Sequence, residues 1–150
     1  MINADTLSQF SLFDGLPESI LKELAAMSTE TSIKKGEFIF REGATADKLH
    51  FLINGSVALR VNLTSRPDSV TVSFVSTPYQ SFGWSSVVAP FHYTSSAECD
   101  EDSNLLIIPA KPFMSLLEKN PEHGFIVMRR ITEIISGRLR NSRQALVKTI

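Results

Sequence analysis

The sequence predicts a mainly β domain, a sandwich or barrel of short strands, with helices at both ends. Three observations predict this fold class. Residues 30–108 contain short runs of β-branched and apolar residues separated by turn residues. Residues 17–27 and residues 121–148 instead place apolar side chains at helical spacing. The chain of 150 residues is also long enough to bury one core without disulfide bonds, since Cys99 is its single cysteine. We therefore expect one domain over residues 1–150.

The first expected element is a short amphipathic helix near the N-terminus. Pro17 is typical of a helix start, because its fixed φ suits the first turn. The apolar residues that follow at helical spacing are Ile20, Leu21, Leu24 and Met27. We expect residues 1–28 to form leader helices before the strands.

Residues 29–109 are expected to form the barrel. The candidate strands within this part cover residues 38–40, 49–53, 56–61, 69–75, 94–97 and 105–108. Asn54-Gly55 favours a β-hairpin between two of these strands, because a type I′ turn needs positive φ at both central residues. Gly36 and Gly43 are expected at turns on either side of the first candidate strand.

Residues 110–150 are expected to be helical, with one long helix over residues 121–148. An apolar stripe runs along it, with Gly137 as a weak point; its members are Phe125, Val127, Met128, Ile131, Ile134, Ile135, Leu139 and Leu146. Because one small barrel cannot cover so long a stripe, we expect a homodimer in which two copies of this helix pair. A buried carboxylate in the stripe, as in Ile131→Glu, is expected to release monomers.

Charge and composition exclude several classes of protein. The formal net charge of −1 gives no general reason to bind nucleic acid, although residues 121–150 carry six Lys and Arg side chains against Glu122 and Glu133. The N-terminus lacks the basic and apolar regions of a secretory signal, and no apolar run is long enough to span a membrane. We therefore expect a cytoplasmic protein that does not bind membranes.

The sequence predicts no catalytic or metal site. His50, His92 and His123 are dispersed, whereas a metal-dependent barrel enzyme needs clustered ligands. The sequence has no Gly-x-Ser-x-Gly motif and no glycine-rich phosphate loop, and nothing adjacent to Cys99 would activate its thiol. We expect a protein that is not an enzyme and that needs no cofactor. A haem sensor with His50 or His92 as an axial ligand is an alternative.

Residues 33–57 resemble the cyclic nucleotide-binding domain family. The resemblance rests on residues in the family's order, namely Gly36, Glu42-Gly43, Asp47 before an aromatic and apolar strand, and Gly55-Ser-Val57. It extends over almost the whole chain through the leader helices, the segment 81–88 and the long last helix. The resemblance implies a jelly-roll barrel whose last helix dimerises, and a ligand site at a short helical cassette.

The same resemblance implies which residues meet the ligand. In the family the cassette reads Phe-Gly-Glu-x-Ala-Leu-Leu; its amides and a later Arg hold the cyclic phosphate, and its Glu accepts from the ribose 2′-hydroxyl. Here Trp84 stands at the Glu position, and Tyr93 (His92 after a one-residue shift) at the Arg position. No Arg or Lys lies between Arg66 and Lys111. The implied ligand-binding residues are Phe82, Gly83, Trp84, Ser85, Ser86, Tyr93 and Thr94.

We therefore expect a non-catalytic regulatory or sensor module with a degenerate cassette that does not bind cyclic AMP or cyclic GMP tightly. A charge-assisted hydrogen bond contributes roughly 1.5–3 kcal/mol, so losing the Arg alone weakens binding by about one to two decades. Weak anion binding by the cassette amides and by the hydroxyls of Ser85 and Ser86 is still expected.

Two alternative functions follow from the same residues. An active small-molecule sensor would bind a cyclic nucleotide, haem or a planar aromatic ligand, the last in a pocket made aromatic by Trp84, Tyr93, Tyr79, Phe91 and His92. The other alternative is the sensory fragment of a transcription regulator. A DNA-binding helix-turn-helix would need roughly 60–70 further residues, so this chain alone is not expected to bind DNA.

Overall fold

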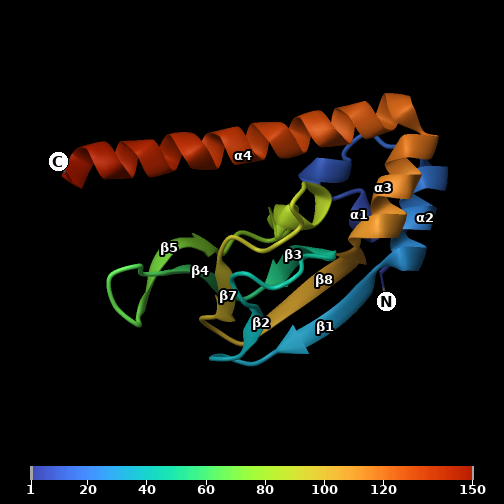
Figure 1. Cartoon of the computed structure of the whole chain (residues 1–150). Coiled ribbons are helices and arrows are strands. Elements are labelled where there is room, and N and C mark those ends of the chain that lie inside the picture. Colours follow the sequence, from blue (N-terminus) through green and yellow to red (C-terminus); the bar gives the residue numbers. More distant parts are fainter. Residues whose placement is uncertain (1, 150) are drawn as a thin grey trace.

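The computed structural model describes residues 2–149, in which short N-terminal helices gather at one end of two four-stranded sheets and a long C-terminal helix runs alongside them (Figure 1). The N-terminal part contains α1 (Ala4–Leu7), the 3₁₀ helix η1 (Ser11–Phe13) and α2 (Glu18–Met27). The side chain of Asn3 caps α1 by accepting a hydrogen bond from the backbone amide of Thr6 at 2.9 Å. Pro17 immediately precedes α2, as the sequence predicts.

The two sheets have the strand orders β1-β8-β3-β6 and β2-β7-β4-β5, with antiparallel pairing throughout. The strands are β1 (Thr29–Ile33), β2 (Phe38–Phe40), β3 (Lys48–Asn54), β4 (Val57–Asn62), β5 (Ser69–Val75), β6 (Ser81–Phe82), β7 (Ser96–Cys99) and β8 (Ser103–Pro109). This arrangement confirms the predicted mainly β, jelly-roll fold with flanking helices.

One local prediction is wrong, because the segment Asn54-Gly55 does not form a β-hairpin. β3 and β4, which it joins, lie in different sheets. Gly55 has a φ of +108°, but Asn54 is not in the left-handed region that a type I′ turn requires. A Cβ on Gly55 would collide with the side chain of Ser103 and lie 2.7 Å from the carbonyl oxygen of Asp102. The glycine therefore allows the chain to cross between the sheets against the start of β8.

The buried side chains form two clusters, one on each side of the sheet that contains β3 and β8. The barrel cluster lies between the two sheets and consists of Leu52, Val57, Leu59, Val75, Phe82, Ala97, Cys99 and Leu105. The helical cluster lies on the other face, where the N-terminal helices and the C-terminal helices pack on the sheet. Its largest fully buried members are Phe10, Phe13, Phe51 and Phe113.

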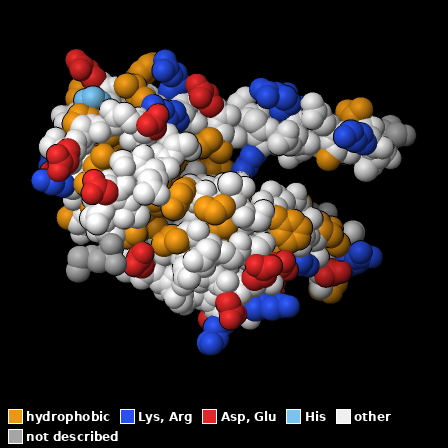
Figure 2. Space-filling model, turned by 180° about the vertical axis from the view of Figure 1, so that it is seen from behind, with side chains coloured by type: hydrophobic (Ala, Val, Ile, Leu, Met, Phe, Trp, Pro, Cys, Tyr) orange, Lys and Arg blue, Asp and Glu red, His pale blue; other side chains and the backbone are white. Residues whose placement is uncertain are grey.

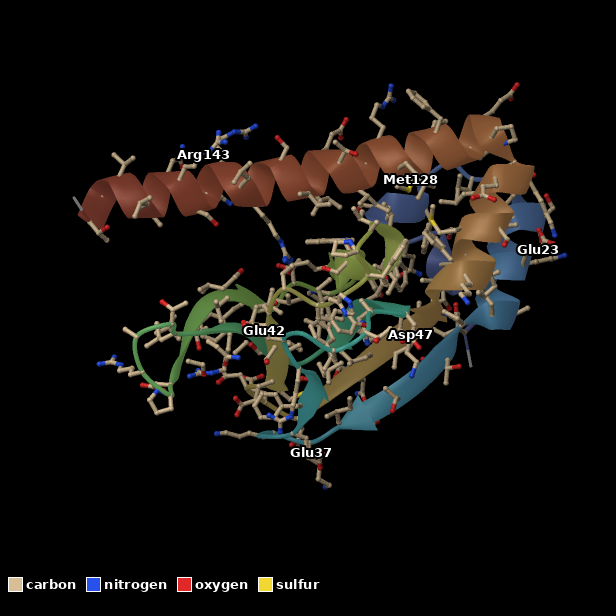
Figure 3. The ribbon with its side chains drawn as sticks, viewed as in Figure 1. Glu23, Glu37, Glu42, Asp47, Met128 and Arg143 are labelled. Carbon is tan, nitrogen blue, oxygen red and sulfur yellow. The ribbon has the colours of Figure 1, made fainter. Side chains whose placement is uncertain are left out.

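Two helices follow the last strand, α3 (Ala110–Lys119) and α4 (Pro121–Thr149). The first part of α4 packs on the helical cluster through Val127 and Ile131, and Met128 packs against its edge (Figure 3). Arg130 fixes this part further, because its guanidinium donates to the backbone oxygens of Leu12 at 3.1 Å and Asp14 at 2.7 Å.

The distal part of α4 extends beyond the helical cluster and runs past the barrel (Figures 1 and 2). Leu139 is 51% exposed there and Leu146 is 63% exposed. Ile131, by contrast, is 1% exposed and belongs to the core of its own chain. The expectation for Ile131→Glu is therefore corrected, since this change would disrupt the fold itself and could not report on pairing between chains. Within residues 2–149 no helix is both long and apolar enough to cross a membrane.

Candidate functional site

The predicted cassette turns sharply out of the barrel immediately after β6. Gly83 adopts a φ of +83° and is followed by a short 3₁₀ helix, η2 (Trp84–Val87). A Cβ on Gly83 would lie 2.9 Å from Nδ1 of His50, so both the conformation and the space favour glycine. Ser86 closes the turn, because its hydroxyl donates to the backbone oxygen of Gly83 at 2.9 Å. The turn exposes Trp84 and Ser85 to a cavity beside it.

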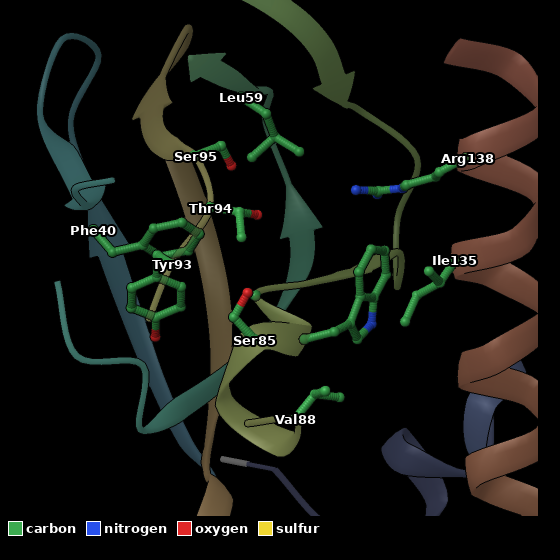
Figure 4. Close-up of a pocket in the computed structure, with 11 residues that line it drawn as sticks. Phe40, Leu59, Ser85, Val88, Tyr93, Thr94, Ser95, Ile135 and Arg138 are labelled. Atoms are coloured by element: carbon green, nitrogen blue, oxygen red, sulfur yellow. The ribbon is translucent and has the colours of Figure 1, made fainter. Parts of the chain in front are cut away.

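A cavity of about 360 Å³ lies between this cassette, the barrel and α4 (Figure 4). Its barrel wall includes Phe40 of β2 and Leu59 of β4, together with residues 93–95 of the segment before β7. Ile135 and Arg138 of α4 close the opposite side. The lining is therefore mostly apolar and aromatic, with a few hydroxyls and one guanidinium, a composition typical of a small-molecule site.

Tyr93 is held firmly in the barrel wall of this cavity. It is 6% exposed, and its ring stacks on Phe40 with 3.8 Å between the ring centroids and an interplanar angle of 10°. Its hydroxyl donates to the backbone oxygen of Lys48 at 3.0 Å. Burial raises the pKa of the Tyr93 hydroxyl above its ordinary value, so the group is neutral near neutral pH. Tyr93 thus presents an aromatic surface and no charge.

Trp84 and Arg138 form the contact between the cassette and α4. The carbon at the centre of the Arg138 guanidinium lies 4.2 Å from the centroid of the Trp84 ring, a cation–π geometry. Both residues also bind Ser81, because the Trp84 indole N–H donates to the Ser81 hydroxyl at 3.1 Å and Nη2 of Arg138 donates to the Ser81 backbone oxygen at 3.4 Å.

The electrostatic state of Arg138 follows from its position between the helix and the barrel. Burial lowers the pKa of its guanidinium from the ordinary value, yet arginine remains cationic in proteins. No carboxylate of residues 2–149 forms an ion pair with it. Among the described residues, the partly buried Arg138 cation is therefore stabilised by the Trp84 ring and by the Ser81 carbonyl, with no carboxylate beside it.

The structure brings together most, but not all, of the predicted ligand-binding residues. Those that line the cavity are Gly83, Trp84, Ser85, Tyr93 and Thr94. Phe82 is instead fully buried in the barrel cluster, and Ser86 is 4% exposed and bonded to Gly83.

The predicted aromatic pocket needs the same kind of correction. Tyr79 packs on Phe10 at 4.6 Å between centroids, in the helical cluster, and does not line this cavity. Phe91 and His92 do not line it either, and Phe91 is 46% exposed. The ring that sequence reasoning missed is Phe40, which stacks on Tyr93 from a strand distant in sequence.

Arg138 is the most important residue that sequence reasoning missed, because cations were sought only in the barrel segment. One sequence signal could have identified it. Arg138 is seven residues after Ile131 and three after Ile135, so it lies on the same helix face as the apolar stripe. A charged residue on the core-facing side of an amphipathic helix indicates a partner or a function for that charge.

His50 lies next to the cavity but does not line it. It is 3% exposed and sits between the rings of Phe40 and Phe82, whose centroids are 5.2 Å and 5.3 Å from its own. Burial lowers its pKa to about 3, and Nδ1 has no hydrogen-bond partner within residues 2–149. The interpretation of His50 as an axial haem ligand gains no support from this enclosed position. The described residues also contain no group of three His, Cys, Asp or Glu side chains that could hold a metal ion.

Comparison with known proteins decides the family. The sequence profile of the cyclic nucleotide-binding domain matches residues 30–120. The chain belongs to the cyclic nucleotide-binding domain family. A crystal structure of a candidate cyclic nucleotide-binding protein from Geobacter metallireducens GS-15 is 32% identical, with a TM-score of 0.80 over 93% of this chain and 99% of that one.

Two more distant members of this structural group share the fold. The Thermus thermophilus catabolite activator protein is 22% identical, with a TM-score of 0.73 over 92% of this chain and 62% of that one. The sensor domain of the transcriptional regulator DNR from Pseudomonas aeruginosa is 21% identical, with a TM-score of 0.75 over 89% of each chain. No curated protein matches the sequence. These two likenesses concern the fold alone, which this chain shares with both proteins.

Proposed function

We propose that this chain is a non-catalytic sensor domain whose cavity does not bind cyclic AMP or cyclic GMP tightly. The observation that carries the proposal is the pair of residues at the two polar positions of the cassette. Trp84 supplies no acceptor for a ribose hydroxyl, and the hydroxyl of Tyr93 already donates to Lys48. A cyclic nucleotide would therefore leave its ribose hydroxyl without the carboxylate partner that the family resemblance implies.

The expected loss of affinity is large even though Arg138 brings a cation to the cavity. A ribose hydroxyl that loses a charged acceptor forfeits roughly 1.5–3 kcal/mol. The bulky Trp84 ring also fills space beside Arg138, where its centroid lies 4.2 Å from the guanidinium. Arg138 approaches from α4 and not from the barrel wall, so it does not replace a cation at the Tyr93 position.

Titration calorimetry with cyclic AMP and cyclic GMP tests this proposal. We expect no dissociation constant below about 100 μM for either nucleotide, because the missing contacts remove at least one to two decades of affinity. A melting curve of the same sample provides the control that the protein is folded. A low-micromolar dissociation constant for either nucleotide would contradict the proposal.

We further propose that the chain forms a homodimer through residues 121–148. Support comes from exposed apolar residues on the distal part of α4, among them Leu139 and Leu146, which lie outside both buried clusters. A symmetric pairing would cover this face in both copies at once.

A second candidate function is the sensory part of a transcription regulator. The likeness of the fold to the sensor domain of the transcriptional regulator DNR from Pseudomonas aeruginosa favours it. On this proposal the chain by itself does not bind DNA. Fluorescence anisotropy with a labelled random duplex at moderate salt is expected to show no binding, and a salt-sensitive rise in anisotropy would contradict the expectation.

A further inference from the structure

We propose that the cavity between the cassette and α4 binds a small planar aromatic anion, such as an aromatic carboxylate, through Arg138. This inference rests on the proposed function, because it names the ligand class of the same cavity. The ligand would place its aromatic ring against the apolar walls and its negative group at the guanidinium. None of the comparisons assigns such a ligand to this chain.

The first argument comes from charge. Arg138 is partly buried and has no carboxylate partner among the described residues. A partly buried cation without a counter-charge is costly, so an anion that enters the cavity gains the attraction that the chain itself does not provide. The residues that line the cavity include no Asp or Glu that would repel such an anion.

The second argument comes from hydrogen-bond geometry. A guanidinium has five N–H donors, and within residues 2–149 Arg138 donates one hydrogen bond, from Nη2 to the backbone oxygen of Ser81. The remaining donors match the two oxygens of a carboxylate, which arginine binds in a bidentate manner. In Figure 4 the guanidinium extends from α4 toward the cavity, opposite the hydroxyls of Thr94 and Ser95.

The third argument comes from the aromatic and apolar walls. The Trp84 ring packs against the guanidinium of Arg138. The stacked pair of Phe40 and Tyr93 forms the barrel side of the cavity (Figure 4). Leu59, Val88 and Ile135 complete the apolar surface. Such walls favour a flat ring, because offset or edge-on contacts between rings add to the burial of apolar area.

A cyclic nucleotide shares a planar ring and one negative charge with this ligand class, but it differs in its ribose. The sugar brings a hydroxyl that needs an acceptor, and Trp84 stands where the family resemblance implies the accepting Glu. An aromatic carboxylate brings no such group, so every polar atom it carries is satisfied by Arg138 and the nearby hydroxyls. A site that leaves a ligand hydroxyl unpaired discriminates against that ligand.

The experiment compares an acid with its neutral isostere. Calorimetry with 2-naphthoate and 2-naphthamide is expected to give roughly tenfold or greater preference for the acid, because only the acid makes a charge-assisted pair with Arg138. Benzoate, which fluoresces little, is expected to change the emission of Trp84, the single tryptophan of the chain. Arg138→Gln is expected to remove the preference, while Arg140→Gln, an exposed arginine on the same helix, retains it.

The outcomes separate this inference from the proposed function. Equal binding of acid and amide, a preference that survives in Arg138→Gln, or no heat with 2-naphthoate up to millimolar concentration overturns the aromatic-anion site. The proposed function stands in these cases, because it fails only if cyclic AMP or cyclic GMP binds tightly. Should Arg138→Gln not fold, the acid-to-amide ratio of the unmodified chain at low and high salt still decides, since added salt weakens an ionic contact.

Discussion

The distal part of α4 offers a direct test of assembly through the change Leu139→Glu. Leu139 is 51% exposed and lies outside both buried clusters, so its side chain is free to contact a second copy without supporting its own fold. This distinguishes it from Ile131, which is 1% exposed. A glutamate at position 139 is well solvated in a monomer but would be buried and unpaired in a helix pair.

Two-fold symmetry doubles the effect of this change. Full burial of a leucine side chain contributes about 1.5–3 kcal/mol, and about half of Leu139 is already covered in the monomer, which leaves roughly 1 kcal/mol per copy. Burying an unpaired carboxylate adds at least about 1–3 kcal/mol per copy. Over both copies the dimer loses roughly 4–8 kcal/mol, so its dissociation constant rises by about three to six orders of magnitude.

Sedimentation velocity over a range of protein concentrations measures this shift. Asn141→Glu is the matched control, because it adds the same charge two residues along on another face of the exposed helix. We expect a dimer for the parent and for the control, and a monomer for Leu139→Glu, with equal melting temperatures for all three. A monomeric parent, or a Leu139→Glu variant that remains dimeric, would remove this face of α4 from the interface.

Three further changes probe the cassette and its surroundings. Because the folded-state pKa of His50 is about 3 and its ordinary value is 6.5, the unfolded state binds the extra proton between these values. The free energy of unfolding should fall by up to about 1.4 kcal/mol per pH unit as the pH drops through this window. Urea titrations at several pH values should show this loss for the unmodified chain but not for His50→Leu. Gly83→Ala should lower the free energy of unfolding by about 1–2 kcal/mol or more, because the φ of residue 83 is +83° and the Cβ of the alanine would meet His50. An unchanged urea midpoint would contradict this prediction. Trp84→Glu with Tyr93→Arg should strengthen cyclic AMP binding by roughly 2–5 kcal/mol in calorimetry. Trp84→Glu alone should gain less, because it restores the ribose acceptor without a cation at position 93 for the phosphate; a folded double variant without any gain refutes this prediction.

The strands that the sequence predicted correctly are those whose residues alternate or cluster as apolar and β-branched runs. Residues 69–75 are the clearest case, because the predicted range and β5 coincide. Local patterns could not reveal β1, whose sequence Thr29-Glu-Thr-Ser-Ile33 is largely polar and becomes a strand only by pairing with β8. The turn at Asn54-Gly55 was misassigned for a related reason, since only tertiary contact with Ser103 determines that it joins two sheets.

The candidate site was predictable where it follows the chain and unpredictable where it joins distant elements. Gly83, Trp84 and Ser85 are consecutive, so a resemblance in sequence was enough to place them at the cavity. Phe40 and Arg138 come from a strand and a helix almost a hundred residues apart, and no local pattern relates them. The helical period of α4 carries the missing information, because it places Arg138 on the helix face that also carries Ile131 and Ile135.

β3 and β8, the two central strands of their sheet, have both faces buried. In β3, Leu49 and Phe51 point into the helical cluster, and Leu52 points into the barrel cluster; in β8, Leu106 and Leu105 divide in the same way. Amide hydrogens in such strands exchange with solvent only when the whole domain opens. Exposed helical turns open locally, so the amides of the distal part of α4 exchange much earlier. We therefore expect the slowest-exchanging amides of the protein in β3 and β8, where their exchange would report its global stability.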